Sequence, residues 1–300
     1  MLAGISVFCF AASYAVALLL EATRPFFRSG LRGILMLGFT GAGLLAHTLF
    51  LGYRAFTAES APLSSPFDWY LLAAWTLVCV YLISIYSYPK VPLGLFILPL
   101  VLGLIGMAEY SSRQPFAQHP AAQVWGPVHG VFLLLGYVAV IVGFVAGLMY
   151  LLQSRRLKRK VLPSNGLKLP SLERLERINS RAIVLSALFV GLGFVSGIVL
   201  NAVSRGRGLD SVPWTDPVIW RLGSMLLWLC AAALFSSFYK PAQRGRKVAY
   251  LTVASFCFLA VSVLLFRALL DSEHDQKVDR AVSQQTDIVQ DRFRSVEVRR

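Results

Sequence analysis

Four histidines carry most of the chemistry that this 300-residue sequence could perform. His47 lies inside an apolar run, in "GLLAHTLFLGY", and His129 opens another, in "WGPVHGVFLLLGY", whereas His119 and His274 lie in polar segments. Neutral imidazole is a common ligand for metal ions and haem iron. Two imidazoles on opposite faces of a porphyrin would give six-coordinate iron. The alternatives are polar tips at a membrane interface and, for His47, a structural hydrogen bond to a neighbouring helix.

A ten-residue connector, "SVPWTDPVIW", holds two tryptophans, two prolines and an aspartate between two apolar runs. A porphyrin is a flat apolar disc with two carboxylates, so a docking surface needs aromatic faces, a restrained loop and nearby cations. Trp214 and Trp220 offer the faces, and the cations that could bind the propionates are Arg205, Arg207 and Arg221. Because tryptophan is enriched at both membrane interfaces whatever the function, an aromatic belt is the alternative interpretation.

The composition predicts an integral membrane protein, because 56% of the residues are hydrophobic and only 15% are charged. Apolar runs of nearly membrane-spanning length recur at 2–20, 33–51, 69–87, 91–108, 128–152, 182–202, 222–239 and 248–266. Backbone groups in lipid must be hydrogen-bonded within their own segment. We therefore expect an all-α, polytopic membrane protein with about eight transmembrane helices over 1–270, followed by a polar tail, 271–300.

The basic residues predict the orientation of this helical domain. Of the 29 lysines and arginines, 17 fall in four connectors, around 21–32, 87–90, 153–181 and 239–247. The positive-inside rule assigns these connectors to the cytoplasm. Both termini are then expected on the outer side of a plasma (inner) membrane, with an extracytoplasmic tail. The net charge of +14 thus indicates contact with membrane lipid and no nucleic-acid partner.

Two further segments predict helix packing and a cytoplasmic surface. Gly191, Gly193 and Gly197 cluster in "GLGFVSGIV", where small residues would let neighbouring helices approach closely. The long basic linker ends in "SLERLERIN", an amphipathic stretch with Glu173 and Glu176 near Arg177. We interpret this stretch as a surface helix at the membrane interface, with docking of a soluble partner as the alternative.

The order of these features resembles the CcsA/ResC family of cytochrome c assembly proteins and the related HemX proteins, which belong to a haem-handling superfamily. The stretch "LLAHTLFLGYRAFTAESAPLSSPFDWYLLAAW" is similar to the early helices of the family. One helix of the family begins with an external histidine, and it is similar to "VHGVFLLLGYVAVIVGFVAGLMYLL". Another helix of the family, together with the charged segment that precedes it, is similar to "LERLERINSRAIVLSALFVGLGFVSGIVLNA". The resemblance covers about residues 35–270.

The resemblance implies roles for individual residues. In the family, a tryptophan-rich external loop called the WWD motif presents haem between two external histidines, and a histidine within the membrane assists. The degenerate remnant of that motif here consists of Trp214, Asp216, Pro217 and Trp220. His129 corresponds to the first external ligand and His47 to the histidine within the membrane. His274 takes the place of the second external ligand, with His119 as its alternative.

The resemblance also implies a function. The chain would bind b-type haem transiently on the outer face and present it to apocytochrome c, beside a ResB/CcsB-type membrane subunit. No nucleophile or acid–base pair is evident, so any enzymatic activity would be that of the haem-handling subunit of a cytochrome c haem lyase. The alternative is a HemX-like regulator of glutamyl-tRNA reductase that acts through its cytoplasmic linker, 154–181. A small-molecule transporter is a third interpretation.

Overall fold

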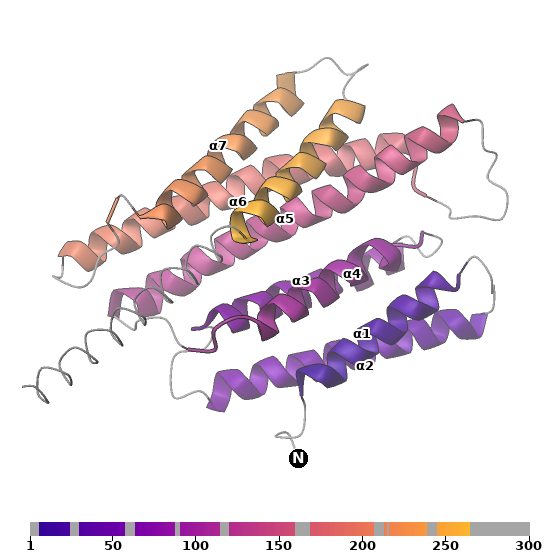
Figure 1. Ribbon diagram of the computed structural model, residues 1–300, viewed down its shortest axis with the longest axis horizontal. Coiled ribbons are helices and arrows are strands. Elements are labelled where there is room, and N and C mark those ends of the chain that lie inside the picture. Colours follow the sequence, from indigo (N-terminus) through magenta and orange to yellow (C-terminus); the bar gives the residue numbers. More distant parts are fainter. Residues whose placement is uncertain are drawn as a thin grey trace, which may run out of the picture.

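The protein is all-helical in the part of the chain that the computed structural model describes (Figure 1). That part comprises 6–24, 30–57, 64–87, 91–114, 120–159, 169–206, 213–214, 216–238 and 245–264, with the backbone alone at 120–124. Its helices are α1 (Val7–Ala22), α2 (Gly30–Thr57), α3 (Pro66–Ser87), α4 (Gly94–Glu109), α5 (Pro120–Lys158), α6 (Leu172–Gly206), α7 (Pro217–Phe238) and an eighth helix (Gly245–Leu264). The eight helices expected from the sequence are confirmed.

The helices have the length and composition of a polytopic membrane protein. Six of them, α2, α3, α5, α6, α7 and the eighth helix, are long and apolar enough to cross a membrane. The other two, α1 and α4, are apolar helices of 16 residues, about 24 Å long at 1.5 Å per residue. These two are therefore shorter than the ~30 Å hydrocarbon core of a typical bilayer.

The helices form two groups that lie side by side. Figure 1 shows α1 to α4 on one side, and α5, α6, α7 and the eighth helix on the other. Val138, Ile141 and Val145 of α5 belong to the same buried apolar cluster as Leu71 and Val78 of α3. The junction between the groups is therefore made mainly by α3 and α5.

Glycines set the closest helix contacts in the second group. Gly143 and Gly147 of α5 lie against Thr252 of the eighth helix, and their four-residue spacing is the small-xxx-small pattern that lets helices in membranes approach. On α6, Gly193 lies against Leu133 of α5 and Gly197 lies against His129. The packing role predicted for the glycine cluster of α6 is confirmed for these two glycines.

The ends of the helices alternate, so each end of the bundle gathers its own set of residues. At the basic end, where α1, α3 and α5 end and the last turn of α5 carries three cations, Glu21 of α1 lies near Tyr81 of α3 and Gly94 of α4. At the opposite, tryptophan end, α3 and α5 begin, α6 ends and α7 begins with Trp214 beside it. The backbone amide of Phe67 donates there to the carbonyl of Ser112, at 3.3 Å.

Asn179 is an energetic anomaly in the second group. The residue lies on α6 and is fully buried, and neither the oxygen nor the nitrogen of its side-chain amide has a hydrogen-bond partner in the described part of the chain. An unsatisfied buried polar group costs about 1–3 kcal/mol. We therefore expect Asn179 to lower the stability of the helix bundle.

We predict that Asn179→Leu raises the free energy of unfolding by about 1–3 kcal/mol, because it removes that cost. The measurement is thermal unfolding of the purified protein in detergent. Ser180→Ala is the matched control, because the Ser180 hydroxyl accepts a hydrogen bond from Ser236 at 3.3 Å and its loss should lower stability. A lower unfolding temperature for Asn179→Leu would contradict the prediction and indicate that bound water satisfies the amide.

Candidate haem site

His129 is held in one tautomer by α6. Its Nδ1 donates a hydrogen bond to the carbonyl oxygen of Gly193 at 2.7 Å, and the hydroxyl of Ser196 lies 3.5 Å from the same nitrogen. A carbonyl only accepts, so Nδ1 of the neutral ring carries the proton and Nε2 carries the lone pair. Metal-binding histidines commonly use their second ring nitrogen in this way. The neutral His129 ring therefore presents Nε2, rather than Nδ1, as the nitrogen that could bind a metal.

The position of the His129 ring depends on a glycine opposite it. A Cβ atom built on Gly197 would lie 2.9 Å from Cε1 and 3.0 Å from Nδ1 of His129. Real Cβ atoms are essentially never found so close to another heavy atom. Gly197 thus makes room for the imidazole ring, which links the glycine cluster of α6 directly to the candidate ligand.

Trp69 of α3 is an aromatic residue that the sequence did not assign to this site. Its indole ring occupies the space that a side chain at Gly130 would need. Gly130 directly follows His129, so the first helix group places an indole next to the turn of α5 that carries this candidate ligand. In the sequence, the only signal of this contact was the glycine that follows His129, because a glycine in the middle of a helix often marks a close contact with another element.

The described part of the tryptophan connector contains a turn and a helix cap. The backbone amide of Asp216 donates to the carbonyl of Pro213 at 2.9 Å, and Oδ1 of Asp216 accepts from the backbone amide of Val218 at 2.8 Å. Pro217 is the first residue of α7. Aspartate at the N-cap followed by proline is a favoured way to begin a helix. The Asp-Pro pair therefore has a structural role, which is to fix the start of α7.

The two tryptophans keep most of their surface available. Trp214 is 51% exposed and Trp220 is 71% exposed. Tryptophan side chains are usually well buried when they serve the core of a protein. These two indoles are placed to meet a membrane surface or a ligand.

Counting residues along the helices places this loop at the same depth as His129. Gly136 lies against Val190, and Gly191, the next residue of α6, lies against Leu226 of α7. His129 lies seven residues before Gly136, which is about 10 Å along α5, and Pro217 lies nine residues before Leu226, which is about 14 Å along α7. The imidazole and the start of α7 are therefore within about one helical turn in depth.

The candidate cations are only partly brought to this region. Arg205 is exposed in the last turn of α6, and Arg221 of α7 lies within electrostatic range of the Tyr137 hydroxyl on α5. Arg207, His119 and His274 lie outside the described residues. The haem-binding roles of all these residues stay predictions from the sequence.

His47 lies in a separate, closed environment within the first group. Its ring is fully buried and stacks on Phe10 of α1, with ring centroids 4.1 Å apart and an interplanar angle of 3°. Nδ1 lies 3.3 Å from the Tyr14 hydroxyl, and Nε2 is buried without a partner in the described part of the chain. The free nitrogen fits a ligand, but α1 covers the ring. His47 is ten residues before Thr57, the last residue of α2, which is about 15 Å along the helix.

The fold and the site together define a class: a polytopic, all-helical membrane protein that holds an oriented imidazole at the depth of an exposed tryptophan loop. Residues 63–274 match the family model described as "Cytochrome C assembly protein". The chain therefore belongs to the cytochrome c assembly protein family. The matched segment includes His129 and the tryptophan connector, whereas His47 precedes it.

Individual relatives carry names that agree with this family. The chain is 24% identical to the "Cytochrome c biogenesis protein CcsA" of Microcystis aeruginosa over 283 residues, covering 76% of this chain and 85% of that protein. It is 26% identical to the CcsA protein of Chlorella vulgaris, covering 75% of this chain and 80% of that protein. The CcsA protein of Guillardia theta is 22% identical, with coverage of 76% and 82%.

Proposed function

We propose that this protein handles haem in c-type cytochrome biogenesis and presents it at the tryptophan end for attachment to apocytochrome c. The observation that carries the proposal is the orientation of His129, whose Nδ1 is bound to the Gly193 carbonyl so that Nε2 keeps its lone pair. Family membership supports the same function, because the similar proteins are named for cytochrome c biogenesis.

The residues of the site fit haem as a transiently bound, b-type cargo. Nε2 of His129 would bind the iron from one side, and the second axial ligand would be His274 or His119. The exposed indoles of Trp214 and Trp220 would contact the porphyrin face, with Asp216 and Pro217 fixing the loop that carries them. Arg205, Arg207 and Arg221 would bind the propionates, and His47 would assist from within the membrane.

The proposed partners follow from the attachment chemistry. In a c-type cytochrome each cysteine S–H adds across a haem vinyl group, which forms a thioether bond. This chain would contribute by holding the haem in position, and a ResB/CcsB-type subunit would complete a cytochrome c haem lyase. We place the chain in the plasma (inner) membrane, with its tryptophan end and both termini on the outer side.

The test is a visible absorption spectrum of the detergent-purified protein after haem has been supplied. The wild type is expected to give a Soret band, which should weaken or shift in the variant that lacks the true second ligand. Comparison of His274→Ala with His119→Ala therefore assigns that ligand. A wild type without a Soret band would contradict the proposal. It would then favour the HemX-like regulatory role, in which deletion of "SLERLER" should abolish function and substitutions at the tryptophan end should be silent.

We predict that Gly197→Ala weakens haem binding by about tenfold, the lower end of the effect of losing support for a metal-binding histidine. The new methyl group would lie 2.9 Å from Cε1 and 3.0 Å from Nδ1 of His129, so a shift of the ring or of the helix must disturb the bond from Nδ1 to the Gly193 carbonyl. The measurement is a haem titration followed at the Soret band. Gly191→Ala is the matched control on the same helix, since its Cβ would make only an ordinary 3.6 Å contact with Leu226. Equal affinities for the two variants would contradict the prediction.

A further inference from the structure

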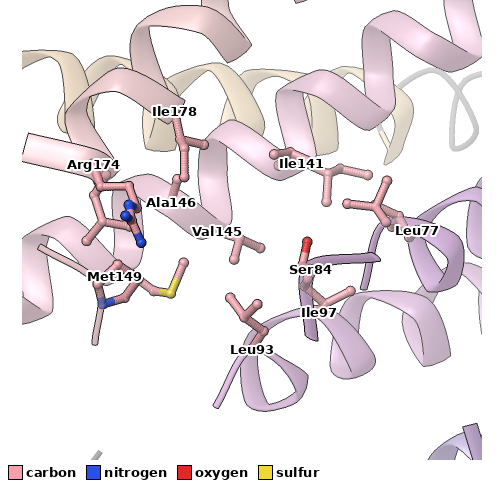
Figure 2. A pocket seen from close by; sticks show the side chains of 14 residues that line it. Leu77, Ser84, Leu93, Ile97, Ile141, Val145, Ala146, Met149, Arg174 and Ile178 are labelled. Carbon is pink, nitrogen blue, oxygen red and sulfur yellow. The ribbon is translucent and has the colours of Figure 1, made fainter. Parts of the chain in front are cut away.

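A cavity of about 70 Å³ lies between the two helix groups, far along the helices from the candidate haem site. Figure 2 shows its walls, with Leu93 and Ile97 of α4 facing Val145 and Met149 of α5. Most of the lining is apolar. Its location joins α3 and α4 to α5 and α6, where the first helix group meets the second.

Two polar side chains interrupt the apolar lining. Ser84, near the end of α3, points its hydroxyl group into the cavity, and Arg174, in the first turn of α6, lies at its edge (Figure 2). The last turn of α5 adds Arg155, Arg156 and Lys158 on the same side of the bundle. The cavity is therefore mostly apolar, with Arg174 at its edge and further cations at the same end of the bundle.

Size and charge together select the occupant. Sites that bury a whole drug-sized ligand occupy roughly 300–1,000 Å³, so a cavity of about 70 Å³ accepts only part of a long, thin molecule. Water is a poor occupant because the lining is mostly apolar. A phospholipid fits both conditions, since one acyl chain can enter the cavity from the membrane while its phosphate stays beside the cations. Basic pockets between membrane helices are known to bind anionic lipid headgroups in this way.

We propose that this cavity is a binding site for an anionic phospholipid of the leaflet at the basic end. The segment of one acyl chain that is nearest the headgroup lies between Leu93 and Met149, and the phosphate binds Arg174. The bound lipid joins the two helix groups and so stabilises their relative position. This site is independent of haem binding.

The experiment is thermal unfolding of the delipidated protein in detergent, titrated with phosphatidylglycerol, phosphatidylcholine or glycerol phosphate. Phosphatidylglycerol is expected to raise the unfolding temperature at the lowest concentration. Arg174→Gln should raise the half-saturating concentration of phosphatidylglycerol about tenfold. Arg177→Gln is the matched control, because it removes the same charge one helical turn away from Arg174. The Arg177 side chain pairs with Glu173 at 3.1 Å and does not line the cavity.

Each other outcome overturns the proposal. Equal phosphatidylglycerol titrations for Arg174→Gln and Arg177→Gln would show that the lipid responds to overall charge. An equal response to glycerol phosphate would show that the acyl chain is not bound, and an equal response to phosphatidylcholine would show that the headgroup charge is not recognised. Native mass spectrometry of the two arginine variants gives a second readout, in which only Arg174→Gln should lose bound phosphatidylglycerol.

Discussion

Cytochrome c maturation is expected to fall by more than about 100-fold when His129 is replaced by alanine. Loss of a side chain that merely supports a metal-binding histidine typically costs 10–100-fold in affinity or activity, and His129→Ala removes the proposed ligand itself. The measurement is the amount of covalently attached haem in cells that depend on this protein for c-type cytochromes. The Soret band of the purified variant should weaken in parallel.

Ser196→Ala is the matched control for this prediction. Its hydroxyl lies 3.5 Å from Nδ1 of His129, but the shorter bond to the Gly193 carbonyl, at 2.7 Å, stays in place. The control should therefore mature cytochromes at nearly the wild-type level. Normal maturation in His129→Ala cells, where deletion of the whole protein abolishes it, would rule out His129 as the ligand.

The helices could be predicted from the sequence, but their ends could not. The apolar runs located all eight helices, because a membrane span must be apolar along most of its length. Several helices continue beyond their runs: α2 extends to Thr57 rather than 51, and α6 begins at Leu172 rather than 182. Hydrophobicity marks only the part of a helix that faces lipid or the core. The charged stretch "LERLERINSR" is equally helical, and its amphipathic pattern predicted a helix but not that this helix is continuous with the apolar run of α6.

The candidate site was only partly predictable for a related reason. His129 and the tryptophans stand out by residue type, whereas the bond from His129 to the Gly193 carbonyl joins residues 64 positions apart. The contact of Trp69 with Gly130 and the cover of α1 over His47 are also tertiary contacts. One sequence without spatial information cannot pair these residues. Asp216 is the opposite case, since a local capping rule explains its position.

Arg54→Met is expected to lower the free energy of unfolding by about 2 kcal/mol, between the values for exposed and buried ion pairs, because the Arg54 side chain is 33% exposed. Nε of Arg54 donates to Oδ1 of Asp68 at 2.7 Å, and Oδ2 of Asp68 accepts from the Ser65 hydroxyl at 2.7 Å. The Asp68 side chain is only 10% exposed. Loss of the arginine would leave this carboxylate buried with one hydroxyl donor, where α2 meets α3.

Arg113→Met isolates this effect because the two arginines share one further contact. Their guanidinium carbons lie 4.8 Å (Arg54) and 4.7 Å (Arg113) from the centroid of the Phe67 ring, so both variants lose a comparable cation–π interaction. The partner of Arg113, however, is Glu109, whose side chain is 42% exposed, and exposed pairs contribute about 0–1 kcal/mol. Thermal unfolding in detergent should therefore separate the variants. Equal losses of stability in the two variants would mean that the Phe67 contact, rather than the buried Asp68 carboxylate, contributes most to stability at this end of the first helix group.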